Sequence, residues 1–175
     1  MELSGKRIAI LVDDHYQEME VWYPYYRLKE AGAEIAVVGA KAGEKYSSKV
    51  GYPIVSTHSY DEVKPENFDG VVVPGGYAPD MIRRYPKALG FVRELDAKGK
   101  LVAAICHAGW VLCSADILRG RHATCFFAIK DDLVNAGAVY EDAEVVIDRN
   151  LITSRKPDDL PAFCRAAIQF LTTAK

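Results

Sequence analysis

Four apolar runs without polar alternation stand out along the chain, at residues 6–12, 34–39, 70–73 and 101–105. Strands that are covered on both faces of a sheet have this continuous apolar character, whereas strands with one solvated face alternate. The runs therefore predict a mostly parallel sheet whose two faces are both covered.

Segments with helical periodicity separate these runs. Between residues 20 and 31, Val21, Tyr25 and Leu28 recur at the spacing of one helix face. Pro24 requires this helix to begin near Glu20, since proline is tolerated in the first turn. Further helices are expected within 79–99, directly after residue 105, over the stretch IKDDLVNAGA, and from residue 160 to the end, the last of these with Asp158 or Asp159 as its N-cap.

Two short hairpins complete the pattern, one between residues 46 and 59 and one over 143–154, which turns at Arg149-Asn150. Strands that alternate with helices predict a single α/β domain over residues 1–175, doubly wound, with helices on both faces of the sheet. In such sheets, binding and catalytic sites form at the carboxyl ends of the strands.

Composition narrows the class of partner. The 175 residues carry a formal net charge of −2, which favours neither nucleic acid nor an anionic membrane as a partner. No apolar run approaches the roughly 20 residues that span a bilayer, and the N-terminus lacks a signal peptide, so a cytoplasmic location is expected.

The cysteines do not predict a metal site. The four, at positions 106, 113, 125 and 164, form no CxxC pair and have no metal-ligand spacing with the four histidines. In a reducing compartment we expect free thiols and no cofactor. Packing against the core is the expected role of Cys113 and Cys164.

Candidate chemistry appears where strand 101–105 ends in Cys106-His107. A cysteine at a sharp turn from strand to helix faces the free N–H groups of the helix, which favour the nucleophilic thiolate and lower its pKa. The His107 amide and the turn Gly75-Gly76, after strand 70–73, are candidates for an oxyanion hole. An inert buried thiol and a solvent-facing imidazole are the alternatives for Cys106 and His107.

Glu20 follows the first strand and is the third candidate. A carboxyl close to a thiolate favours its own protonated form, so Glu20 is a candidate hydrogen-bond donor and proton shuttle. The alternative is a simple capping acid at a helix N-terminus. Side chains from separate segments are expected to line the pocket: His15, Gln17, Trp110, Phe126 and Phe127.

Six stretches together resemble the ThiJ/PfpI superfamily, in particular the PfpI-type intracellular proteases and general stress proteins. They are EMEVWYPYYRLKEAG, FDGVVVPGGYAPD, AICHAG, LRGR, IKDDLVNAGA and SRKPDDLPAF. The resemblance covers nearly the whole chain. It implies a flavodoxin-like three-layer sandwich of the kind also found in class I glutamine amidotransferases, with a nucleophile elbow at Cys106.

The same resemblance implies roles for individual residues. Glu20 matches the buried acid of the family, and His107 matches the catalytic histidine, with oxyanion-hole amides from Gly75, Gly76 and His107. Asp80 matches the acid that orients this histidine from a neighbouring subunit, so a homodimer or a hexamer built of dimers is implied.

This chain departs from the family pattern in three places. Ala108-Gly109, followed by Trp110, stands where Gly-Pro is usual, Gln17 replaces a further acid, and Asp80 is shorter than the usual glutamate. The shorter side chain weakens the case for peptidase activity.

Three functions follow from this comparison. The first is a glyoxalase or deglycase, in which Cys106 adds to a 2-oxoaldehyde or its adduct on a protein, and Glu20 and His107 move a proton between adjacent carbons. The second is an intracellular cysteine peptidase with Asp80 contributed by a partner subunit. The third is a redox sensor or chaperone that acts through oxidation of Cys106.

Overall fold

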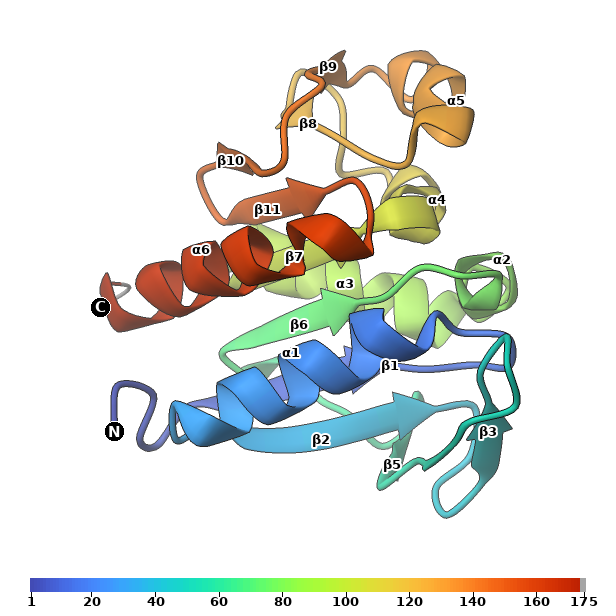
Figure 1. Ribbon diagram of the computed structural model, residues 1–175, viewed down its shortest axis with the longest axis vertical. Helices are drawn as coiled ribbons and strands as arrows, with labels where there is room; N and C mark the ends of the chain where they lie inside the picture. The colour runs from blue at the N-terminus through green and yellow to red at the C-terminus, as the bar shows by residue number, and fades with distance from the viewer. Residues whose placement is uncertain (174–175) are drawn as a thin grey trace.

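The computed structural model describes residues 1–173, and its centre is a seven-stranded sheet in the order β10-β11-β7-β6-β1-β2-β5 (Figure 1). All neighbouring strands pair in parallel except β10, which runs antiparallel to β11. The strands of this sheet are β1 (Arg7–Leu11), β2 (Glu34–Gly39), β5 (His58–Ser59), β6 (Gly70–Val73), β7 (Leu101–Ile105), β10 (Val146–Asp148) and β11 (Leu151–Ser154).

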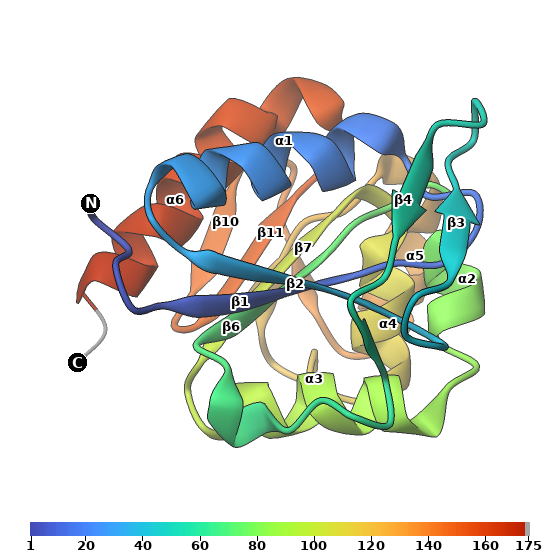
Figure 2. The same cartoon turned by 90° about the horizontal axis from the view of Figure 1, so that it is seen from below.

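Helices cover both faces of the sheet. Figure 2 shows α1 (Glu18–Glu30) and α6 (Leu160–Thr173) together on one face, with α3 (Pro86–Ala97) on the other. Beside α3 lies α4 (Gly109–Ser114), which also contacts α2 (Ala78–Ile82) and α5 (Lys130–Asn135). The predicted flavodoxin-like α/β sandwich is confirmed.

Two small sheets lie beside the main one. A hairpin of β3 (Lys45–Ser47) and β4 (Pro53–Val55) confirms the predicted turn region, and β8 (His122–Ala123) pairs with β9 (Val139–Tyr140). The sequence pattern missed β5, β8 and β9, because two residues are too few to produce a periodic signal.

The start of α1 differs from the prediction. The helix begins at Glu18, so Pro24 lies in its interior and not in its first turn. The side chain of Gln17 caps the helix by accepting a hydrogen bond from the Glu20 N–H at 3.0 Å. The premise about Pro24 was wrong, but Glu20 still falls in the first turn.

The prediction for the last helix was also imprecise. Asp158 and Asp159 belong to a 3-10 turn over Pro157–Asp159 that precedes α6. The Asp159 carboxylate accepts hydrogen bonds from the backbone and side chain of Arg155.

The strand order places β1 and β6 side by side at the centre, with β7 next to β6. The chain moves outward from β1 to β2 in one direction and from β6 to β7 in the other. This change of direction creates a crevice at the carboxyl ends of the strands. The segments after β1, β6 and β7 meet there, and they carry Glu20, Gly75-Gly76 and Cys106. Within residues 1–173, no helix is long and apolar enough to cross a membrane.

Candidate active site

Cys106 occupies a strained turn at the end of β7. Its φ angle is 63°, a left-handed conformation that non-glycine residues rarely adopt. A 3-10 turn over Cys106–Ala108 leads directly into α4. Strain of this kind persists only where the surrounding structure enforces it, and it is concentrated at functional sites. The turn leaves 8% of Cys106 exposed.

Glu20 reaches the thiol from the first turn of α1. Its side chain is fully buried, and one carboxyl oxygen accepts a hydrogen bond from the Gly75 N–H at 2.7 Å. Gln17 holds this arrangement through two hydrogen bonds. Its side-chain oxygen accepts from the Glu20 N–H, and its backbone N–H donates to the Gly75 carbonyl at 3.2 Å. Gln17, expected to line the pocket, instead supports the acid.

Gly75 packs against both the acid and the thiol. A Cβ atom at this position would lie 2.6 Å from Glu20 Oε2, 2.7 Å from Cys106 Cβ and 3.0 Å from Cys106 Sγ. No side chain fits there without displacing one of the two groups. Gly76 is equally constrained, because its φ is +74° and a Cβ would lie 2.4 Å from the His15 carbonyl.

The electrostatics of the Glu20–Cys106 pair favour a proton on the sulfur. Burial raises the pKa of Glu20 to about 7, although hydrogen bonds from Gly75 and Cys106 favour its ionised form. Burial and then the negative charge of Glu20 raise the pKa of Cys106 to about 12, against the effect of the His107 and Gly76 N–H groups. The expectation of a lowered thiol pKa was wrong, because desolvation outweighs the N–H groups of the short turn.

The backbone N–H groups around the sulfur differ from the predicted set. Those of His107 and Gly76 are directed at Cys106 and favour negative charge there. The N–H of Gly75 donates to Glu20 instead. The His107 and Gly76 N–H groups therefore remain candidates for an oxyanion hole, and the Gly75 N–H binds the Glu20 carboxyl.

His107 contacts the thiol directly. Its Nδ1 lies 3.3 Å from Cys106 Sγ. The ring stacks on Phe126, with centroids 5.0 Å apart and planes at 27°, and meets Trp110 edge-on at 5.1 Å. Burial and then the positive charge of Lys49 lower the pKa of His107, so the imidazole is neutral at pH 7 and able to accept a proton.

Three of the expected residues make no hydrogen bond or ring contact with Cys106, Glu20 or His107 within residues 1–173. Asp80 is in α2, half exposed and ion-paired with Arg84, and within residues 1–173 it has no hydrogen bond to His107. The side chain of His15 is exposed, and this residue contributes through its backbone, which bonds to Ser47 and Tyr77. Phe127 is 75% exposed and packs on Phe126.

Lys49 is a residue that sequence reasoning missed. It follows β3, and its N–H donates to the Tyr16 carbonyl at 3.0 Å, which brings its charge close enough to lower the pKa of both Glu20 and His107. A lysine in a hairpin turn carries no distinguishing pattern, so nothing in the sequence indicated it.

The remaining cysteines are free thiols, and burial raises the pKa of each. Cys125 and Cys164 are buried, as core packing requires, and Cys113 is half-buried. In the described part of the chain, no cluster of three or more histidine, cysteine, aspartate or glutamate side chains has metal-binding geometry.

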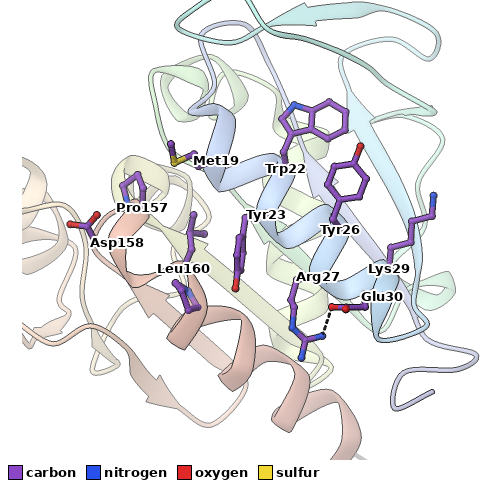
Figure 3. Close-up of a pocket in the computed structure, with 11 residues that line it drawn as sticks. Met19, Trp22, Tyr23, Tyr26, Arg27, Lys29, Glu30, Pro157, Asp158 and Leu160 are labelled. Atoms are coloured by element: carbon purple, nitrogen blue, oxygen red, sulfur yellow. Dashed lines mark hydrogen bonds and ion pairs between the residues drawn. The ribbon is translucent and has the colours of Figure 1, made fainter.

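A broad apolar hollow lies elsewhere on the surface. Figure 3 shows that side chains of α1 line it on one side and residues at the start of α6 on the other, among them Met19, Trp22, Tyr23, Tyr26 and Leu160. None of the candidate site residues lines this hollow.

The fold and the site together define an α/β protein with a cysteine at a strained strand-to-helix turn, a buried acid against its thiol and an adjacent histidine. The chain belongs to the DJ-1/PfpI family, whose model matches residues 6–170.

Curated relatives support this assignment over almost their whole length. A deglycase of Pyrococcus abyssi is 43% identical over 165 residues, which cover 94% of this chain and 99% of that protein. Protein/nucleic acid deglycase 2 of Escherichia coli is 42% identical over 169 residues, 95% of this chain and 98% of that protein. The proposed cysteine protease YraA of Bacillus subtilis is 37% identical over 167 residues, 95% and 99% of the two chains.

Solved structures agree. A two-domain protein from Anabaena variabilis, with DJ-1/ThiJ/PfpI-like and ferritin-like domains, matches with a TM-score of 0.93 and 45% identity. The match covers 95% of this chain and 48% of that one. Drosophila melanogaster DJ-1beta matches with a TM-score of 0.89 and 30% identity, over 95% of this chain and 90% of that one. The relatives' names place the chain in a family of deglycases and cysteine proteases.

Proposed function

We propose that this protein is a cysteine-dependent enzyme that converts 2-oxoaldehydes such as methylglyoxal, or their early adducts on proteins, into 2-hydroxy acids. One observation carries the proposal: a thiol, a buried carboxyl whose pKa is raised to about 7, and an imidazole whose Nδ1 lies 3.3 Å from the sulfur meet at one point. This set provides a nucleophile and two groups that exchange protons near neutral pH.

In the first step the sulfur of Cys106 bonds to the aldehyde carbon. Because the thiol is protonated at pH 7, its proton passes to the Glu20 carboxylate as the C–S bond forms. The carbonyl oxygen accepts hydrogen bonds from the N–H groups of His107 and Gly76, and it then receives the proton from Glu20. With an adduct as substrate, the C–N bond breaks in this step and the amine leaves with the proton.

The second step is an internal rearrangement. The neutral His107 imidazole removes the proton from the former aldehyde carbon, and the hydroxyl proton on that carbon passes to the neighbouring ketone oxygen. His107 then returns its proton to the adjacent carbon, which turns the hemithioacetal into the thioester of a 2-hydroxy acid. Water then cleaves the thioester, and the thiol regains its proton. The balance is one dicarbonyl and one water consumed for one hydroxy acid, without an external oxidant or reductant.

The test is turnover of methylglyoxal to lactate by wild type, Cys106→Ser and Cys113→Ser. We expect the Cys106 variant to lose all measurable turnover and the Cys113 variant to retain it, since Cys113 lies in α4 outside the reacting cluster. Full turnover by Cys106→Ser would refute the proposal.

Peptidase activity is the second candidate, and the similarity to YraA favours it. The 8% exposure of Cys106 counts against it, since a polypeptide needs a more open cleft than a three-carbon dicarbonyl. Casein incubated beside the methylglyoxal assay separates the two: cleavage that iodoacetamide abolishes would favour the peptidase.

A redox-sensing role has less support than either enzyme. Peroxide reacts with thiolates, and the raised pKa of Cys106 keeps its thiol protonated at neutral pH. Preferential oxidation of Cys106 over Cys113 at low peroxide, measured by mass spectrometry, would revive this role.

A further inference from the structure

The imidazole of His107 is held in its productive orientation by few polar contacts. Within residues 1–173, its one side-chain hydrogen-bonding contact joins Nδ1 to Cys106 Sγ at 3.3 Å. A rotation about χ2 that turns the ring out of this plane would move Nδ1 away from the sulfur. Within the described chain no carboxylate is hydrogen-bonded to the imidazole, so the groups of this chain that limit its rotation are those that pack against the ring.

Two aromatic rings pack against the His107 imidazole. Phe126 stacks on the imidazole at 5.0 Å and 27°, and the Trp110 ring meets it at 5.1 Å and 68°. Phe126 is itself tied to the turn, because its N–H donates to the Cys106 carbonyl at 3.2 Å. Stacked and edge-to-face aromatic pairs prefer these separations and angles. Together, the two rings limit how the imidazole turns.

Trp110 is fixed in turn from α5. Its indole Nε1 donates to Asp132 Oδ2 at 2.7 Å, a charge-assisted hydrogen bond. On the α2 side, the Arg83 guanidinium lies 5.9 Å from the Trp110 ring centroid, and its Nε donates to Ser114 at 2.9 Å. The indole is therefore held by groups from two separate helices.

Gly109, the residue before Trp110, allows α5 to pack closely against α4. A Cβ at Gly109 would lie 2.6 Å from Leu133 Cδ1 and 3.1 Å from Ile129 Cδ1. A side chain at position 109 would have to displace the ends of the Leu133 and Ile129 side chains, which pack against α4 here. The Ala108-Gly109-Trp110 stretch and Asp132-Leu133 therefore form one packed unit.

We propose that Asp132 is a positioning residue that acts through Trp110 to orient the His107 imidazole toward the Cys106 sulfur. This inference rests on the proposed function for its kinetic consequence, but its geometric content is independent of the substrate. Losing the indole–carboxylate contact releases the Trp110 ring, and the imidazole then samples orientations in which Nδ1 no longer faces the thiol.

The experiment compares Trp110→Phe, Asp132→Ala and their double variant with Asp132→Asn. We expect Asp132→Ala and Trp110→Phe each to lower kcat about tenfold with KM changed less than about twofold, because a small misplacement of a catalytic group acts on the chemical step. The double variant should lose no more than either single one, since both remove the same contact. Asp132→Asn should retain most activity, because its amide oxygen still accepts from the indole.

Asp131→Ala is the matched control. This exposed acid precedes Asp132 in the first turn of α5, so its removal alters the charge of that turn without touching the indole. We expect its kcat to equal that of wild type.

A second measurement does not depend on turnover. NMR of the His107 ring nitrogens should show the pKa of His107, which burial lowers, moving upward in Asp132→Ala and Trp110→Phe but not in Asp131→Ala. Unchanged ring signals and pKa in both variants would overturn the inference, as would equal activity loss in Asp131→Ala. If wild type fails to convert methylglyoxal, the proposed function fails while the NMR comparison still decides the inference.

Discussion

Replacement of Glu20 by glutamine should make the folded protein more stable at alkaline pH. The pKa of Glu20 is raised from 4.5 to about 7 by burial. An acid with a raised folded pKa binds protons more tightly in the folded state. Its contribution to stability is therefore fully present below pH 4.5 and is lost as the pH rises through 7.

The size of the effect follows from the shift. At about 1.4 kcal/mol per pH unit, the difference between 4.5 and about 7 corresponds to roughly 3 kcal/mol of stability lost between acid and alkaline solution. Glutamine has no charge to desolvate, and its amide oxygen still accepts from the Gly75 N–H. Glu20→Gln should therefore match wild type near pH 5 and exceed its free energy of unfolding by about 2–3 kcal/mol at pH 8.5.

Urea denaturation of both proteins at half-unit intervals from pH 5 to pH 8.5 measures this difference. Glu30→Gln is the control, since Glu30 is an exposed residue of the same helix whose ion pair with Arg27 contributes little. Parallel stability curves for wild type and Glu20→Gln across this range would show that Glu20 does not hold its proton as argued, and the assignment of Glu20 as a base with a pKa near 7 would fail with it.

Three further outcomes follow from the same geometry. Because Glu20 must be ionised to accept the thiol proton, kcat/KM for methylglyoxal should rise through about pH 7 and level off above it. A kcat/KM that falls over this interval would contradict the assigned direction of proton transfer. Gly75→Ala should lower activity about 100-fold, since its Cβ would lie 2.6 Å from Glu20 Oε2, whereas Gly90→Ala, with no atom within 4 Å of the added Cβ, should leave turnover intact. If Asp80 acts in a neighbouring subunit, Asp80→Ala and Cys106→Ser should each be inactive. Unfolding the two variants and refolding them together should then restore activity at about a quarter of the sites of a dimer. A mixture as inactive as its components would place Asp80 outside the site.

Much of the fold could be predicted from hydrophobic patterning. The continuous apolar runs at β1, β2, β6 and β7 correspond to strands buried on both faces, and the periodic segments became helices at the expected places. The register of α1 could not be predicted, because it depends on the Gln17 cap, and glutamine is not among the residues that usually signal a helix start.

The site was predictable where position along the chain determines position in space. Cys106, Glu20 and Gly75-Gly76 each follow a parallel strand, so their proximity follows from the sheet order. The balance between burial and hydrogen bonding was not predictable, because it depends on how much water each group loses. For the same reason the pKa of Cys106 was misjudged. Lys49 was overlooked because a lysine in a hairpin turn carries no distinguishing pattern.

The raised pKa values suggest how this site avoids unwanted reactions. A permanent thiolate would react with peroxide and other electrophiles at all times. In the proposed mechanism the proton stays on Cys106 until a carbonyl carbon arrives, and Glu20, with a pKa near neutrality, takes it as the bond forms. Under that mechanism, reactivity depends on a substrate that fits beside the Gly76 and His107 amides, where the developing oxyanion would be stabilised. The acid that makes the folded state less stable above pH 7 is, on this argument, the group that restricts the nucleophile to its substrate.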